Sequence, residues 1–111
     1  MTWDTVYEII DSFALLGENW DGYGSGHLSK EFIEKYKPII KQLEFMEPPF
    51  AVPYPGGFQI EWQFDNYYLE ISFDDTDKIM FLKENNHEYE TCKFTFETFD
   101  IEKVKLFCPI V

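Results

Sequence analysis

The sequence predicts an α+β domain in which two N-terminal helices pack on one face of an antiparallel β-sheet meander of about four strands, followed by a short C-terminal helix. Three observations support this class. Apolar residues recur at helical spacing up to residue 46, they alternate with polar residues from residue 58 onward, and short turn sequences separate the alternating segments. The 111 residues fit one domain, spanning 1–111, and an apolar fraction of 45% provides for a core.

Two helices precede the predicted sheet. Gly17 follows the first, residues 3–16, and we expect it to end this helix in the left-handed conformation that glycine readily takes. Ser29 is the expected N-cap of the second, residues 30–46, and Pro38 inside it predicts a kink or a break. The expected inward faces comprise Trp3, Val6, Tyr7, Ile10, Phe13 and Ala14, and then Phe32, Ile33, Tyr36, Ile40 and Leu43.

A proline-rich connector, residues 47–57, separates the helices from the sheet. Its four prolines predict either polyproline-like or edge-strand geometry. The next two segments form a hairpin, because Asp65-Asn66 between them suits a two-residue turn. The period of two directs Phe58, Ile60, Trp62, Phe64, Tyr67, Leu69, Ile71 and Phe73 to one face of the sheet.

Two further strands are expected at residues 78–84 and 89–96, joined by a turn at residues 85–87. Asp100 then suits the N-cap of a short helix. The sheet is expected to leave its second face exposed to water, as antiparallel sheets often do.

Charge is the strongest global signal. The chain has 21 acidic residues against 9 basic ones, all of them lysine, and a formal net charge of −12. Such a charge repels DNA, RNA and anionic membranes, and the lack of arginine removes the side chain best suited to phosphate recognition. A basic protein would be attracted; alternatively, the acidity only maintains solubility. No apolar run approaches a membrane span and the N-terminus does not resemble a signal peptide, so a cytoplasmic location is the default expectation.

The predicted hairpin places two carboxylates side by side. Glu61 faces Glu70 across the strands, and the outer face also carries Asp74 and, in one register, Glu90. Like charges directly opposite are mildly destabilising, so a lysine on a neighbouring strand, a metal or a basic partner is expected to offset them. The outer face is either a charged docking surface or a solvated one.

No pattern predicts an enzyme, a cofactor or a metal site. The two histidines, His27 and His87, have no metal-binding spacing, and the acidic turn at residues 74–77 lacks the glycine and glutamate of a calcium loop. The glycines at 22, 24 and 26 are not followed by the Gly-Lys-Ser/Thr of a phosphate-binding loop. Cys92 and Cys108 are expected to be free thiols in a reducing cytoplasm.

Residues 18–26, ENWDGYGSG, place two large aromatics among glycines. Trp20 and Tyr23 either form a binding hot spot or fold back onto the core. Together with a later G-x-x-x-E-W strand, this segment resembles a family of small bacterial and phage proteins with an NWDGYGA-type segment. The matching residues are Asn19, Trp20, Asp21, Gly22, Tyr23, Gly24, Gly57, Glu61 and Trp62. Ser25-Gly26-His27 departs from the alanine and proline that usually follow in the family.

These features favour a non-enzymatic, acidic inhibitor that binds and blocks a basic nucleic-acid-handling protein, such as a nuclease, a toxin or a CRISPR effector. The class resembled includes antitoxins, immunity proteins and anti-CRISPRs, some acting as nucleic-acid mimics. The expected partner-binding residues are Glu61, Glu70, Asp74 and Asp75 for charge, with Tyr68 and Tyr23 as aromatic anchors.

Two alternatives stay open. One is a small-ligand or cation-binding module built on residues 19–24 and the acidic turn. The other is a homo-oligomer, such as a homodimer, joined through an edge strand or through an apolar patch that contains Met80 and Leu82.

Overall fold

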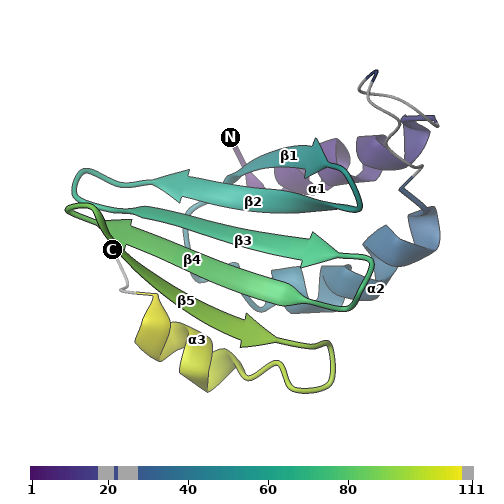
Figure 1. Cartoon of the computed structure of the whole chain (residues 1–111). Helices are drawn as coiled ribbons and strands as arrows, with labels where there is room; N and C mark the ends of the chain where they lie inside the picture. The colour runs from purple at the N-terminus through teal and green to yellow at the C-terminus, as the bar shows by residue number, and fades with distance from the viewer. Residues whose placement is uncertain (18–21, 23–27, 109–111) are drawn as a thin grey trace.

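The computed structural model describes residues 1–17, 22 and 28–108. The sheet has the simple order β1-β2-β3-β4-β5, with every neighbouring pair antiparallel, and the helices lie on one side of it (Figure 1). The α+β class is therefore confirmed, with five strands where about four were expected. The elements are α1 (Trp3–Ser12), the 3-10 turn η1 (Phe13–Leu15), α2 (Lys30–Lys41), β1 (Phe50–Tyr54), β2 (Gly57–Gln63), β3 (Tyr68–Asp74), β4 (Ile79–Asn85), β5 (Glu88–Phe94) and α3 (Ile101–Phe107).

The helices begin where the sequence places their caps. The Ser29 hydroxyl accepts a hydrogen bond from the backbone N–H of Phe32 at 3.0 Å, and the Asp100 carboxylate accepts one from Glu102 at 3.0 Å. Each bond satisfies a backbone donor that the first helical turn leaves without a partner.

The expected role of Gly17 is wrong. The first helix passes into the η1 turn, whose C-cap Leu16 has φ −73°, and Gly17 does not have a positive φ. The 3-10 turn tightens the end of the helix and supplies a hydrogen bond from Leu16 N–H to the Phe13 carbonyl, so a left-handed cap is not required.

Of the kink or break predicted at Pro38, the break does not occur. Helix α2 continues through this residue to Lys41, and hydrogen-bonded turns then carry the chain to Met46. Burial of the apolar face of α2 stabilises the helix by more than the lost backbone hydrogen bond costs, because Ile33, Tyr36 and Ile40 are all buried against the sheet.

The proline-rich connector contains the edge strand β1. A two-residue turn of Pro55 and Gly56 joins it to β2, and Gly56 has φ 85°, as the second position of such a turn requires. Pro53 faces Phe58 at a position whose backbone groups point away from β2, so its missing N–H costs no bond within the sheet.

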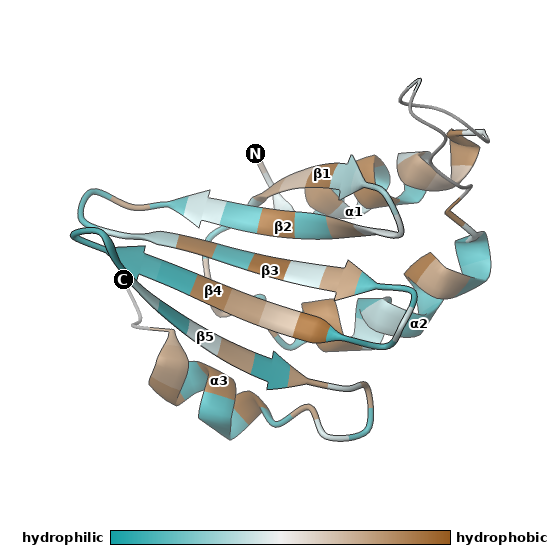
Figure 2. Cartoon of the chain, in the orientation of Figure 1, coloured by the Kyte–Doolittle hydropathy of each residue, from teal (hydrophilic) through white to brown (hydrophobic). Residues whose placement is uncertain are grey.

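The core lies between the covered face of the sheet and the helices. Hydrophobic and hydrophilic bands alternate along β2 and β3 (Figure 2), and all eight predicted inward residues of this hairpin are buried or partly buried. Phe58 and Phe73 stack at its centre with ring centroids 5.1 Å apart. Of the helices in the described part of the chain, none is long and apolar enough to cross a membrane.

Candidate protein-binding site

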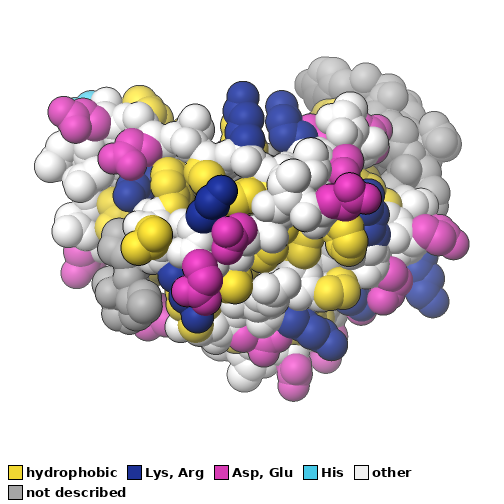
Figure 3. Space-filling view, turned by 90° about the horizontal axis from the view of Figure 1, so that it is seen from below, with side chains coloured by type: hydrophobic (Ala, Val, Ile, Leu, Met, Phe, Trp, Pro, Cys, Tyr) yellow, Lys and Arg dark blue, Asp and Glu magenta, His cyan; other side chains and the backbone are white. Residues whose placement is uncertain are grey.

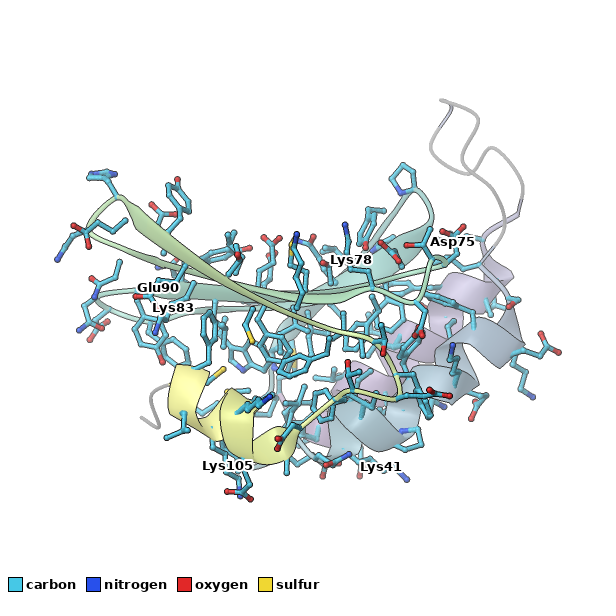
Figure 4. All side chains as sticks on the ribbon, turned by 60° about the horizontal axis from the view of Figure 1, so that its bottom comes forward. Lys41, Asp75, Lys78, Lys83, Glu90 and Lys105 are labelled. Carbon is cyan, nitrogen blue, oxygen red and sulfur yellow. The ribbon has the colours of Figure 1, made fainter. Side chains whose placement is uncertain are left out.

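In the described part of the chain, no helix lies on the second face of the sheet (Figure 4), and we call this face the open face. Its side chains alternate with those of the core along each strand, so the strand registers define its members. They are Phe50, Val52 and Tyr54 on β1; Gln59, Glu61 and Gln63 on β2; Tyr68, Glu70, Ser72 and Asp74 on β3; Met80, Leu82 and Glu84 on β4; and Tyr89, Thr91 and Lys93 on β5.

Two carboxylates meet near the middle of the open face. Glu61 lies directly opposite Glu70, in the register that the Asp65-Asn66 turn predicts. The hydroxyl of Tyr68 lies 2.9 Å from an oxygen of each carboxylate, and the side-chain amide of Gln59 donates to Glu61 at 3.0 Å. Two neutral donors, Tyr68 and Gln59, therefore partly offset this like-charge pair, and no described lysine forms an ion pair with it.

The Tyr68 hydroxyl has a single proton to share between two acceptors. Burial, followed by the hydrogen bonds to Glu61 and Glu70, raises the pKa of Tyr68 above its usual value, so the hydroxyl remains a donor at neutral pH. It donates to one carboxylate at a time. Within the described residues neither glutamate forms an ion pair, so the carboxylate oxygens of the pair have acceptor capacity for a further donor.

Apolar side chains flank the carboxylate pair in the same row of the sheet. Phe50 is opposite Glu61 on the β1 side and is 62% exposed, and Leu82 is opposite Glu70 on the β4 side. Met80 lies on the same face of β4, which confirms the expected outward position of both residues. A depression of about 280 Å³ lies beside the pair, lined by Tyr54, Gln59, Glu70, Ser72, Asp74, Lys78 and Met80.

The acidic turn uses one of its predicted binding residues internally. One oxygen of Asp74 accepts hydrogen bonds from the backbone N–H groups of Thr76 and Lys78 and from the Thr76 hydroxyl. Desolvation alone would raise the pKa of Asp74, but these bonds together lower it. Asp74 therefore organises the turn, and Asp75 is the exposed acid beside it.

Asp77 links the β3–β4 turn to helix α2 and to the segment after β5, and the sequence did not predict this role. Its carboxylate accepts a 2.7 Å hydrogen bond from the hydroxyl of buried Tyr36 on α2, and a 3.1 Å bond from the backbone N–H of Phe96. The bond from Tyr36, with the bond from Phe96 and the charge of Lys35, lowers the pKa of Asp77. Nothing in the sequence links Tyr36 to a residue 41 positions away.

Glu90 does not belong to the open face, which corrects that expectation. It lies opposite Lys83 on the covered face, and the two side chains form an ion pair at 3.6 Å (Figure 4). The reason is the turn before β5, which has two residues, Asn86 and His87, so that Asn85 and Glu88 pair. A three-residue turn would have reversed the face of every β5 side chain.

Other expected sites can be placed as follows. Across the described ranges, no three His, Cys, Asp or Glu side chains gather in a way that could hold a metal ion. Cys92 and Cys108 are free thiols, and burial raises the pKa of Cys108 to about 12. Trp20 and Tyr23 lie outside the described residues.

Searches of protein families, of curated proteins and of solved structures found nothing that matches this chain. The resemblance to small bacterial and phage proteins with an NWDGYG segment therefore stays a prediction.

Proposed function

We propose that this chain is a non-enzymatic, acidic protein of the cytoplasm that binds a basic protein through its open face and thereby blocks it. The proposed targets are nucleic-acid-handling proteins, such as a nuclease, a toxin or a CRISPR effector. The observation that carries this proposal is the Glu61–Glu70 pair, which lies on an uncovered sheet face without a cationic partner in the described part of the chain.

The surroundings of the pair suit a protein partner. Phe50 and Leu82 flank the two carboxylates and offer apolar area, while the partly buried Tyr68 brings its hydroxyl to both carboxylates. Interfaces commonly combine such an apolar centre with charged groups that select the partner. The open face provides both in one row of side chains.

Blocking would follow from occupancy of a nucleic-acid site. A protein that handles nucleic acid presents lysine and arginine side chains spaced for phosphates. Carboxylates on neighbouring strands can accept the same charge-assisted hydrogen bonds. The net charge of −12 would also speed the encounter with such a partner and repel nucleic acid itself.

Affinity capture from a lysate of the native host tests this proposal. The wild-type chain is compared with Glu61→Lys/Glu70→Lys and with a matched control, Glu8→Lys/Glu97→Lys. The control changes the net charge equally at exposed residues away from the open face, which form no hydrogen bond or ion pair with any described residue. Circular dichroism checks that each variant is folded.

The expected result is a basic nucleic-acid-binding protein that is captured by wild type and by the control, and is lost with the open-face variant. Excess DNA or RNA should displace it, and higher salt should weaken it. Equal capture by both variants would place binding elsewhere, and a captured protein that nucleic acid does not displace would contradict the blocking mechanism.

A further inference from the structure

The two edges of the sheet differ in their free backbone groups. The Asn86–His87 turn makes Asn85 and Glu88 a hydrogen-bonded pair, and bonding alternates along the strand from there. On β5, therefore, the backbone groups of Tyr89, Thr91 and Lys93 point away from β4. On β1, the outward positions include Pro53, which has no N–H to offer.

The outward groups of β5 have no partner among the described residues. No described side chain or backbone atom bonds the N–H or C=O of Tyr89, Thr91 or Lys93. The next outward N–H, that of Thr95, is already satisfied by the hydroxyl of Thr98 at 2.8 Å. The free edge thus ends where this loop begins, and it spans the three residues that remain.

We propose that the β5 edge accepts an extended, basic segment of a partner protein, which joins the sheet as a sixth, antiparallel strand. Backbone hydrogen bonds to Tyr89, Thr91 and Lys93 would hold the segment, as in other cases of strand addition. This surface is separate from the carboxylate pair, and the proposal does not depend on the function proposed above.

Charge identifies the occupant. The exposed carboxylates of Glu88 and Glu90 lie on the covered side of β5, so every second side chain of an added strand would pass close to them. Glu90 also pairs with Lys83 at 3.6 Å, whereas Glu88 forms no ion pair with a described residue, so the two carboxylates outnumber the one lysine beside them. Lysine or arginine at these alternate positions is the complementary choice. The other side chains would lie beside Tyr89, Thr91 and Lys93 on the open face.

The surroundings of the edge supply apolar area. Viewed from the side of β5 and α3, hydrophobic side chains gather across the middle of the surface, between lysines and acids (Figure 3). Tyr89 on β5 is 63% exposed and Leu106 on α3 is 88% exposed. A second copy of the chain is a poorer occupant, because each copy carries a net charge of −12.

A synthetic peptide tests the edge directly. The probe is an acetylated and amidated seven-residue peptide that alternates lysine and valine, and the readout is hydrogen exchange of individual amides by NMR. In the free protein, the amides of Tyr89, Thr91 and Lys93 should exchange faster than those of Glu90 and Cys92. Millimolar peptide should slow these three amides by about tenfold or more.

Two N-methylated peptides define the register. The peptide residues opposite Tyr89, Thr91 and Lys93 form the hydrogen-bonded pairs with β5, and their side chains lie on the open face. If the peptide lysines lie on the covered face, the residues in these pairs are the valines, so the valine N–H groups bond to β5. Methylation of the valine amides should abolish the protection, whereas methylation of the lysine amides should leave it. If both methylated peptides protect equally, or if no peptide protects these amides at millimolar concentration, the proposal is wrong.

Thr91→Pro supplies the matching change in the protein. Its N–H points outward, so proline removes no bond to β4 and gives β5 the protection that Pro53 gives β1. This variant should lose peptide binding, while Thr91→Val should retain it. Unchanged peptide binding by Thr91→Pro would overturn the proposal. Slow exchange of the three outward amides without peptide, caused by self-association of the protein, would also overturn it. The N-methylated pair keeps the test valid if Thr91→Pro fails to fold.

Discussion

Gly57 is the residue at which β2 has no room for a side chain. It is buried opposite Asp74, and a Cβ added there would overlap the backbone carbonyl oxygen of Phe73. Gly57→Ala should therefore destabilise the protein by about 3 kcal/mol or more, since the two strands must separate to admit the methyl group. Urea unfolding monitored by tryptophan fluorescence measures the change.

Gly17 provides the matched control for this substitution. It has no positive φ, and no atom lies within 4 Å of an added Cβ. Gly17→Ala should change the free energy of unfolding by no more than about 0.5 kcal/mol. Equal effects of the two substitutions would contradict the close approach of β2 and β3 at Gly57.

Asp74 makes a pH-dependent contribution to stability. Its pKa is lowered in the folded protein, so the ionised form stabilises the fold above the unfolded pKa of about 3.9 and this contribution is lost as the pH falls through the folded value. Asp74→Asn keeps an acceptor oxygen but cannot ionise. The advantage of wild type over this variant should be full near pH 7 and should shrink below about pH 4.

Urea unfolding of both proteins across this pH range measures the difference. Asp75→Asn is the control, because the Asp75 side chain accepts no hydrogen bond from the described residues. Its stability should follow that of wild type at every pH. A constant gap between wild type and Asp74→Asn would show that the hydrogen bonds to Asp74 do not favour its ionised form.

Helix α2 lacks one backbone hydrogen bond because of the proline inside it. Pro38 is exposed and lies inside the helix, where it cannot donate to the carbonyl of Glu34. Pro38→Ala should raise the free energy of unfolding by about 1–2 kcal/mol, because alanine restores the helical bond while the unfolded chain becomes more flexible. Thermal unfolding measured by circular dichroism tests this.

Lys41→Ala, at the exposed end of the same helix, is the control for Pro38→Ala and should change the stability by no more than about 0.5 kcal/mol. A destabilised Pro38→Ala would mean that the proline ring makes contacts worth more than the backbone bond it removes.

Strand β1 takes its strand geometry from pairing with the neighbouring strand β2. The prolines of this segment allowed two extended geometries, and pairing with β2 selects the strand. Helix α1 lies against β1, and the indole N–H of Trp62 bonds the Glu47 carbonyl at 2.6 Å, which fixes the start of the connector. An edge strand tolerates proline, because every second residue of the strand directs its backbone groups away from the sheet and needs no partner there.

At the scale of the whole molecule, charge repulsion opposes folding. The described residues contain four ion pairs, Lys35–Asp77, Lys37–Asp11, Lys37–Glu34 and Lys83–Glu90, against 21 acidic residues in the chain. Screening should therefore stabilise this protein. Raising NaCl from about 20 mM to about 300 mM should increase the melting temperature by several degrees.

The counterion identity serves as the control for this prediction. Sodium, potassium and choline chlorides should act equally if the effect is general screening. A melting temperature that stays constant or falls with salt would contradict it, because the ion pairs would then outweigh the repulsion.

The sequence by itself determined the hairpin at the centre of the candidate site. Strict alternation from Phe58 to Phe73, together with the Asp65-Asn66 turn, leaves one register, and that register places Glu61 opposite Glu70. It also determined the helix starts at Ser29 and Asp100, because capping is a local interaction within one turn. Each of these signals lies within a short stretch of chain.

Only the tertiary structure decided which carboxylates are available to a partner. Asp77 is held by Tyr36, and Glu90 is turned to the covered face by the length of one turn. Tyr68 comes to lie between Glu61 and Glu70 only because the pleat brings residues of two strands together. Contacts between residues far apart in the sequence depend on packing and strand register. The composition or periodicity of a single segment therefore does not predict them.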